Sequence, residues 1–216
     1  MFNAHTHINS ANALINAPLG SMQFYENYYY SIGIHPWDYM KYCENAEMLQ
    51  QWLQTYVTLP QVVAIGECGI DRTIDTDVEL QEDLFIQHVE LAQQYNKTLI
   101  IHSVRAYNDI FRVLKQTNFR QPIVFHKFMG NQQIYESFKG FDCYYSFGAE
   151  LFTRLQSVEM LQFLPLEKLL FENDNAEIAI EDVYAFAAQK LCISIENLSV
   201  AVQKTAEKVF TKWSKK

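Results

Sequence analysis

Residues 62–71 read VVAIGECGID, a short apolar run that ends in a carboxylate. The run Val62–Ile65 is rich in β-branched residues and too short for a typical helix, so we expect a buried strand. Residues 98–105, TLIIHSVR, repeat the arrangement, with a strand at Thr98–Ile101 and an imidazole directly after it. Between the two runs, residues 78–95 place apolar side chains at helical spacing. A strand, a helix and a second strand in this order predict a parallel βαβ unit.

Apolar runs of this kind recur along the whole chain. We expect eight strands, at Phe2–Ala4, Ala13–Asn16, Tyr28–Ile34, Val62–Ile65, Thr98–Ile101, Pro122–Phe125, Tyr144–Phe147 and Leu169–Phe171. Further helices are expected at residues 106–117, 131–138 and 194–213, the last with Ser194 as its N-cap. Eight strands that alternate with helices predict an α/β fold of the TIM-type (β/α)8 barrel class.

The N-terminal part of the chain is short for such a barrel. The protein has 216 residues, whereas these barrels typically need about 250. Only 27 residues lie between His7 and His35, and they must contain two strands. This segment offers turn residues and little amphipathic helix, so we expect the first helices to be missing or reduced to turns, which distorts the barrel. No linker or low-complexity stretch divides residues 1–216, and we therefore expect a single domain.

The composition indicates a globular domain with a substantial core, since 49% of the residues are hydrophobic and 19% are charged. No apolar run approaches the ~20 residues needed to span a membrane. The net charge of −8 argues against a protein that coats nucleic acid through many phosphate contacts, but not against an enzyme that holds a few phosphates. No signal peptide is recognisable, and four cysteines without a CxxC pair suit reduced thiols, so a cytoplasmic location is expected.

Residues with metal-binding side chains follow most of the expected strands. Five of the six histidines stand at or just after a strand end, and only His88 lies within an expected helix. The carboxyl ends of the strands form the rim where barrel enzymes place their active sites. The candidate residues at this rim are His5, His7, His35, Glu67, His102, His126 and Asp174.

Imidazole and carboxylate groups are the usual ligands of Zn²⁺, Mn²⁺ and related ions. In an extended segment, side chains two residues apart point to the same side, so His5 and His7 could share one ion with Asp174. A second ion could be held by His102 and His126. Each motif alone also fits a solvated turn or a packed core histidine. Their repetition at successive strand ends favours a site for two divalent metal ions, Zn, Mg or Mn.

Two carboxylates are the expected catalytic groups of this site. Glu67 has two oxygens and could bridge the ions. Two ions about 3.5–4 Å apart can activate a shared water. Asp174 could accept the proton of that water, if it lies within hydrogen-bonding distance.

With these residues in place, the sequence resembles the TatD-type metal-dependent hydrolases, a branch of the amidohydrolase-like barrels. The shared motifs run in order along nearly the whole chain: HTH at 5–7, GIHPW at 33–37, GECGID at 66–71, IIHSVRAY at 100–107, FHKFMG at 125–130, SFGAEL at 146–151 and LLFENDNA at 169–176. The resemblance implies a divalent-metal-dependent hydrolase, commonly a deoxyribonuclease that works from a 3′ end. It also implies that the metal ligands are His5, His7, Glu67, His102, His126 and Asp174.

Basic residues beside the candidate ligands allow two interpretations each. Arg105 and Lys127 could hold a phosphate, or they could form ion pairs with carboxylates at the rim. His35 could contact the substrate, or it could pack within the His-Pro turn. We include all three residues in the candidate substrate site.

Several aromatic residues, His88 and Asp71 are not assigned to the metal site. The stretch FYENYYY at residues 24–30 and the side chain of Trp37 could stack on an unpaired base. Core or subunit packing is favoured for them, because the chain contains 13 Tyr and 15 Phe. His88 is assigned to helix packing, and Asp71 is expected to orient a ligand or cap a turn.

Three functions are compatible with these features. A metal-dependent deoxyribonuclease that cleaves phosphodiester bonds is favoured, with DNA ends or a small phosphorylated substrate as its partner. A hydrolase of a small ester, lactone or amide is the alternative, suggested by the acidic composition and the short N-terminal region. A metal-stabilised scaffold without catalysis is the third. The sequence leaves the oligomeric state open.

Overall fold

The computed structural model describes residues 1–210, and its strands form one eight-stranded sheet in the order of the chain. Every pair of neighbouring strands is parallel. The strands are β1 (Asn3–Thr6), β2 (Ala13–Asn16), β3 (Tyr29–Ile32), β4 (Val62–Asp71), β5 (Thr98–Val104), β6 (Ile123–Phe125), β7 (Cys143–Phe147) and β8 (Leu169–Phe171). The predicted (β/α)8 barrel is confirmed.

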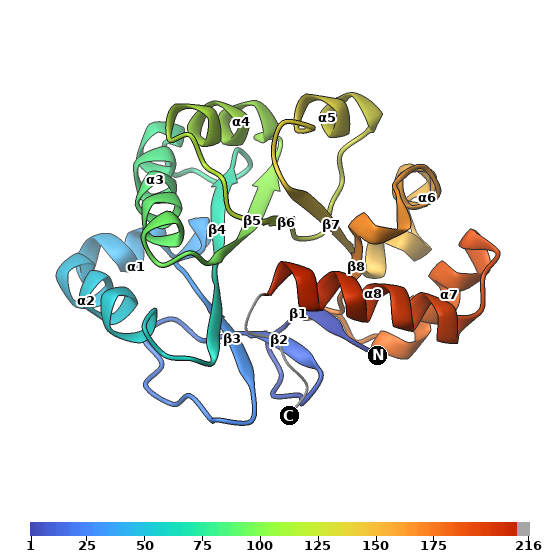
Figure 1. Ribbon diagram of the computed structural model, residues 1–216. Coiled ribbons are helices and arrows are strands. Elements are labelled where there is room, and N and C mark those ends of the chain that lie inside the picture. The colour runs from blue at the N-terminus through green and yellow to red at the C-terminus, as the bar shows by residue number, and fades with distance from the viewer. Residues whose placement is uncertain (211–216) are drawn as a thin grey trace.

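Helices surround the strands on most sides (Figure 1), with α2, α3 and α4 at the left and top and α6 and α7 at the right. The α-helices are α1 (Tyr39–Glu44), α2 (Ala46–Tyr56), α3 (Val78–Gln94), α4 (Tyr107–Gln116), α5 (Gln132–Ser137), α6 (Leu155–Phe163), α7 (Ile180–Leu191) and α8 (Ile195–Val209). Short 3-10 helices are η1 (Pro36–Asp38), η2 (Ala149–Phe152) and η3 (Leu166–Lys168). Helix α8 begins as expected, since the Ser194 hydroxyl accepts a hydrogen bond from the Asn197 N–H at 3.2 Å. The expected extension of this helix to residues 211–213 lies outside the described residues.

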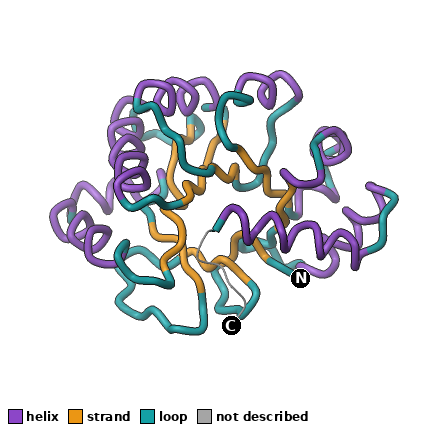
Figure 2. Tube along the Cα trace, in the orientation of Figure 1, coloured by secondary structure: helices purple, strands orange, loops and turns teal. Residues whose placement is uncertain are grey.

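The barrel is thin beside its first three strands. Loops, not helices, join β1 to β2 and β2 to β3 (Figure 2), as the sequence predicted. Aromatic residues of the second loop cover the strands instead: the Phe24 ring stacks on Tyr56 of α2 at 4.7 Å and meets Tyr30 edge-on at 5.1 Å. The indole N–H of Trp52 in α2 also donates to the Ser21 carbonyl at 2.6 Å. Packing against α2 therefore replaces the missing helices, and core packing is confirmed for Phe24 and Tyr30.

Several strands extend beyond the apolar runs that predicted them. Strand β4 continues to Asp71 and β5 to Val104, because pairing between them persists at Gly69↔His102 and Asp71↔Val104. The expected ends at Ile65 and Ile101 were therefore wrong, as was the end of the first strand at Ala4. Backbone hydrogen bonding maintains a strand after its side chains become polar. As a result, His102 lies within a paired stretch of strand, whereas Glu67 lies at the irregularity between Ile65 and Cys68 of β4.

The first and last strands meet at a narrow seam. A single isolated bridge joins Thr6 to Asp174, and the Asp174 N–H donates to the His5 carbonyl at 3.0 Å. The Tyr184 hydroxyl of α7 donates to the Phe2 carbonyl at 2.7 Å and closes the seam from outside. The candidate ligands of β1 thus stand directly beside those that follow β8.

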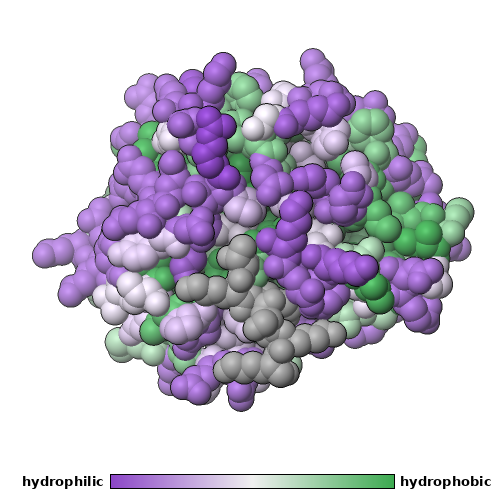
Figure 3. Space-filling model, in the orientation of Figure 1, coloured by the Kyte–Doolittle hydropathy of each residue, from purple (hydrophilic) through white to green (hydrophobic). Residues whose placement is uncertain are grey.

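The surface seen from the side of α8 is largely hydrophilic, with hydrophobic atoms over α7 at the right (Figure 3). Within residues 1–210, no helix combines the length and the apolar character that crossing a membrane would require.

Candidate metal centre

The Glu67 carboxylate stands at the centre of a group of four imidazoles. On Oε1, the ring nitrogens of His102 (Nδ1, 2.8 Å), His35 (Nε2, 3.3 Å) and His126 (Nε2, 3.5 Å) converge. On Oε2, Nε2 of His5 lies at 3.2 Å. Four strands or strand ends that are distant in sequence therefore direct their side chains at one carboxylate.

Two glycines let β4 and β5 approach closely enough for this arrangement. Gly66 (φ +132°) and Gly69 (φ +146°) stand on either side of the pair Glu67–Cys68, and both have backbone conformations that favour glycine. A Cβ at Gly69 would lie 2.0 Å from the His102 carbonyl oxygen, and one at Gly66 would lie 2.4 Å from that of Ile100. Glycine at positions 66 and 69 therefore lets the GECG stretch lie against β5, which brings Glu67 next to His102.

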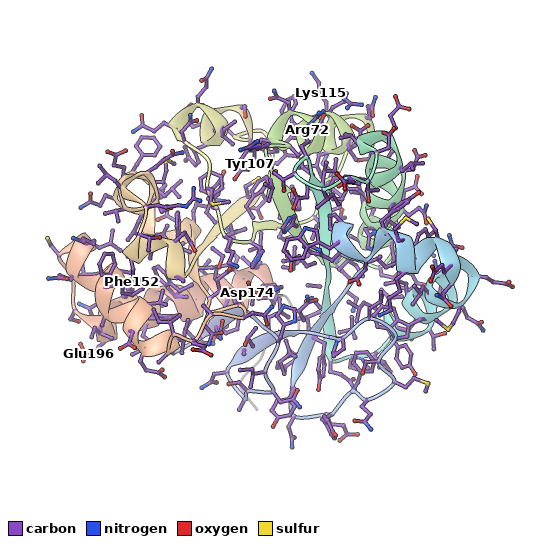
Figure 4. All side chains as sticks on the ribbon, turned by 180° about the vertical axis from the view of Figure 1, so that it is seen from behind. Arg72, Tyr107, Lys115, Phe152, Asp174 and Glu196 are labelled. Carbon is purple, nitrogen blue, oxygen red and sulfur yellow. The ribbon has the colours of Figure 1, made fainter. Side chains whose placement is uncertain are left out.

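A second carboxylate, that of Asp174, faces the same centre from the barrel seam. Its Oδ1 lies 3.2 Å from Nε2 of His7 and 3.5 Å from Nε2 of His5, so His5 stands between Glu67 and Asp174. Its Oδ2 accepts from the Lys127 ammonium group. Asp174 lies near the middle of the molecule in Figure 4, whereas Lys115 and Glu196 lie at the edge.

Two further carboxylates contact the outward nitrogens of the histidine rings. Glu172 Oε1 lies 2.7 Å from Nδ1 of His126, and Asp71 Oδ2 lies 3.3 Å from Nε2 of His102. Carboxylates in this position hold a metal-ligating imidazole in one orientation. Asp71 also accepts from the Thr73 N–H at 2.8 Å, so it both orients a candidate ligand and caps a turn, as expected.

The sequence did not assign Glu172, although a signal for it existed. It directly follows the buried run Leu169–Phe171 and is itself fully buried. A carboxylate is almost never buried without a partner. A charged residue at the end of a core strand could therefore have marked it as part of the site.

The electrostatics of Glu67 and His126 indicate a site built for cations. Burial alone would raise the pKa of Glu67, but the charge of His126, the hydrogen bond from His102 and the close imidazoles of His35 and His5 hold it well below its usual range. Burial would lower the pKa of His126, yet the carboxylates of Glu172 and Glu67 raise it to about 9. Binding of a divalent cation would displace the proton that these carboxylates stabilise on the imidazole.

Asp174 is likewise held in its charged form. Burial favours its neutral form, but a hydrogen bond from His7, the charge of His126 and a hydrogen bond from Lys127 lower its pKa far below the usual range. Lys127 in turn has a raised pKa: burial lowers it, and the pairing with Asp174 more than offsets that effect. Both carboxylates of the centre are therefore ionised at neutral pH.

Three overlapping groups of side chains could each hold a metal ion. They are His5 with His7 and Asp174, His5 with Glu67 and His126, and His35 with Glu67 and His102. Nitrogen and oxygen donors of this kind suit Zn²⁺ and Mn²⁺. Both ring nitrogens of the buried His5 lack a well-directed hydrogen bond among the described residues, despite the carboxylate oxygens nearby. Such a nitrogen fits a metal ligand better than a packed core histidine.

These three groups resemble the ligand sets expected from the sequence, but they differ in which histidines share a group. The set of His5, His7 and Asp174 is the expected one. His102 lies with His35 rather than with His126, and Glu67 belongs to two groups, as a bridging carboxylate would. His35, which the sequence placed in the substrate site, is thus brought to the ligands as well.

The centre opens into a cavity of about 390 Å³ at the carboxyl ends of the strands. His35 and Lys127 line this cavity, together with Trp37, Lys41 and other residues. Arg105 is exposed and is not part of the lining. The ion pair that was the alternative for Lys127 is present, with Asp174 as its partner.

His88 has no place in the centre, as the sequence predicted. It is fully buried in α3, where its Nε2 accepts from the Ile34 N–H at 2.9 Å and its Nδ1 lies 2.8 Å from the Leu84 carbonyl. It thereby secures the backbone directly before His35.

Comparisons with known proteins agree with this architecture. The model of the family described as TatD related DNase matches residues 4–211. The chain is 34% identical over 149 residues to an uncharacterized metal-dependent hydrolase of Buchnera aphidicola, covering 67% of this chain and 55% of that protein. It is 30% identical over 171 residues to the 3'-5' ssDNA/RNA exonuclease TatD of Escherichia coli, covering 74% of this chain and 62% of that protein. The chain thus spans less than two thirds of the length of these relatives.

The fold also resembles solved structures. The crystal structure of YjjV, a TatD homologue from Escherichia coli, superposes with a TM-score of 0.77 and 23% identity. The match covers 93% of this chain and 86% of that one. At this identity the similarity supports the barrel fold alone.

Proposed function

Because this chain belongs to the TatD-related DNase family, we propose that it is a divalent-metal-dependent hydrolase that cleaves phosphodiester bonds at the 3′ ends of single-stranded DNA. One observation carries the proposal: four imidazole nitrogens lie within 3.5 Å of the Glu67 carboxylate at an open cavity. An anionic, histidine-rich centre of this kind suits metal-assisted hydrolysis. The partner would be a DNA end.

The ligands in this proposal are His5, His7, Glu67, His102, His126 and Asp174, around two divalent ions of Zn, Mg or Mn. When bound, the ions would supply the Lewis acidity that lowers the pKa of water and polarises a phosphoryl oxygen. Glu67 would bridge the two positions, since both of its oxygens face imidazoles from different strands.

Side chains of the cavity wall would transfer the proton and bind the phosphate. Asp174 would accept the proton of the attacking water, because it stays ionised at neutral pH and lines the cavity. Lys127 and His35 line the same cavity and would contact the phosphate. A contribution of Arg105 would require its exposed side chain to reach the substrate from outside the cavity.

A direct test uses a 3′-labelled single-stranded oligonucleotide and protein freed of metal by a chelator. We expect mononucleotides to be released when Mg²⁺, Mn²⁺ or Zn²⁺ is returned. Release should be lost in the His102→Ala variant. The Lys115→Ala variant is a matched control, because Lys115 lies at the edge of the molecule (Figure 4). Protein that binds metal, remains folded and releases no nucleotide would disprove the nuclease assignment.

Hydrolysis of a small ester, lactone or amide is the second candidate. The cavity of about 390 Å³ is within the range of small-molecule sites, and this favours it. A panel of chromogenic esters and lactones, assayed with the same metals beside the oligonucleotide, separates the two candidates. Turnover of a small substrate that depends on His102, without nucleotide release, would favour this second function.

A further inference from the structure

Trp37 is an exposed aromatic residue that is nevertheless held firmly. Trp37 is 69% exposed, although the sequence favoured core or subunit packing for it. Its indole N–H donates to Asp71 Oδ2 at 2.9 Å, and its backbone N–H donates to Nδ1 of His35 at 3.1 Å. Core packing was therefore wrong for this residue, and subunit packing, the other interpretation, stays a prediction. Asp71 binds the indole nitrogen at the rim and leaves most of the ring uncovered.

The ring stands at the wall of the candidate metal centre. Its centroid lies 5.0 Å from that of His35, with the planes at 84°, and 6.2 Å from that of His102. Trp37 lines the same cavity as Glu67 and Asp174. A ligand whose phosphate reached the metal centre would therefore have an adjoining group beside the indole.

A basic side chain without a partner lies on the same wall. Trp37 lies in η1, and Lys41 lies in the following helix α1 and lines the cavity. Its ammonium group forms no ion pair with any carboxylate among residues 1–210. Lys127, by contrast, is already paired with Asp174. An uncovered indole and an unpaired ammonium group that line one cavity match a base and the phosphate that adjoins it.

We propose that Trp37 is a stacking platform for an unpaired nucleobase adjoining the scissile phosphodiester, with Lys41 beside the neighbouring phosphate. This inference rests on the proposed nuclease function and specifies how its substrate is bound. Stacking needs an uncovered base face, so it selects single-stranded ends over paired ones. It makes no base-edge hydrogen bonds, so it tolerates all four bases.

The test uses oligonucleotides in which one of the two nucleotides that the terminal phosphodiester joins is replaced by an abasic residue. Each of the two positions is tested separately against the oligonucleotide with all its bases. In the wild-type protein, the abasic substitution on the stacked side should raise KM by roughly 5- to 150-fold, the range for base–aromatic stacking. In Trp37→Ala the two substrates should have similar KM values. Trp37→Phe should keep most of the base dependence, because it retains a ring while losing the hydrogen bond to Asp71. Tyr25→Ala is the control, as Tyr25 is 52% exposed but lies outside the cavity lining.

Two results would overturn the inference. One is a base dependence that persists unchanged in folded Trp37→Ala protein. The other is an equal loss of base dependence in Trp37→Phe and Trp37→Ala, which would mean that the residue acts only through Asp71.

An equilibrium measurement separates this inference from the function on which it rests. The emission of Trp37, taken as the difference between wild type and Trp37→Phe, should be quenched by deoxyadenosine monophosphate but not by deoxyribose 5-phosphate. Quenching without any cleavage would retain the stacking site and reject the nuclease. Cleavage without quenching would reject the stacking site alone.

Discussion

Glu172 Oε1 lies 2.7 Å from Nδ1 of His126, and both side chains are buried. The opposite nitrogen of the same ring, Nε2, lies 3.5 Å from Glu67 Oε1. Asp71 has the same relation to His102, through the other ring nitrogen. Each imidazole is thus held between two carboxylates, one facing the cavity and one behind it.

Replacement of Glu172 by Gln should weaken metal binding by about 10- to 100-fold, the usual effect of losing such a partner. The amide keeps the shape but removes the charge that raises the pKa of His126. Calorimetric titration of metal-free protein with Mn²⁺ or Zn²⁺ measures the change. Glu136→Gln, at an exposed position of α5, should leave the affinity unaltered. Equal affinities in the two variants would contradict the role of Glu172.

Divalent metal should stabilise the fold, because the candidate ligands of β1 and the loop after β8 face each other across the barrel seam. At a metal concentration about 1,000 times Kd, binding adds about 4 kcal/mol to the free energy of unfolding. For a chain of this size the midpoint of thermal unfolding should rise by roughly 10 °C. In Asp174→Asn the rise should be much smaller. Scanning calorimetry with and without metal measures both midpoints. An equal rise of the midpoint in the wild type and in Asp174→Asn would exclude Asp174 as a ligand.

Gly69→Ala should destabilise the protein by about 3 kcal/mol or more. The new Cβ would lie 2.0 Å from the His102 carbonyl oxygen, and φ of +146° strains any other residue. Gly140→Ala is the matched control, since nothing lies within 4 Å of a Cβ there. Its effect should stay within about 0.5 kcal/mol. Urea denaturation measures the stability of the two variants. Similar midpoints would show that β4 and β5 can move apart to accommodate the new Cβ, and would contradict the prediction.

His88 should make stability fall as the pH falls below neutral. Burial lowers the pKa of His88 from its usual 6.5 to about 4 in the folded protein. Between these two values the unfolded chain binds more protons than the folded one, so acid favours unfolding. The contribution of this residue is fully present above pH 6.5 and is lost by about pH 4, on the order of 3 kcal/mol.

The variant His88→Gln isolates this effect from that of the carboxylates in the metal centre. Its stability should be lower at pH 7 but should fall less between pH 7 and pH 5 than that of the wild type. Denaturation at a series of pH values measures both slopes. Parallel slopes would show that His88 does not titrate on unfolding.

Helix α3 and the eight strands could be predicted because their periodicity is local and strong. The strand ends could not, as β4 shows. The apolar run stops at Ile65, but pairing with β5 continues through Gly69 to Asp71. Side-chain hydropathy reports burial, whereas strand length depends on backbone partners that are far away in the sequence.

By itself, the sequence determined which candidate ligands stand beside the apolar runs, and in what order: His5 and His7, then Glu67, His102, His126 and Asp174. These features are local, since each residue stands beside its own apolar run. Only the tertiary structure decided which of them meet, because ring orientation depends on the register between distant strands. It placed His35 beside Glu67, put Glu172 and Asp71 behind the imidazoles, and left Trp37 uncovered at the cavity wall.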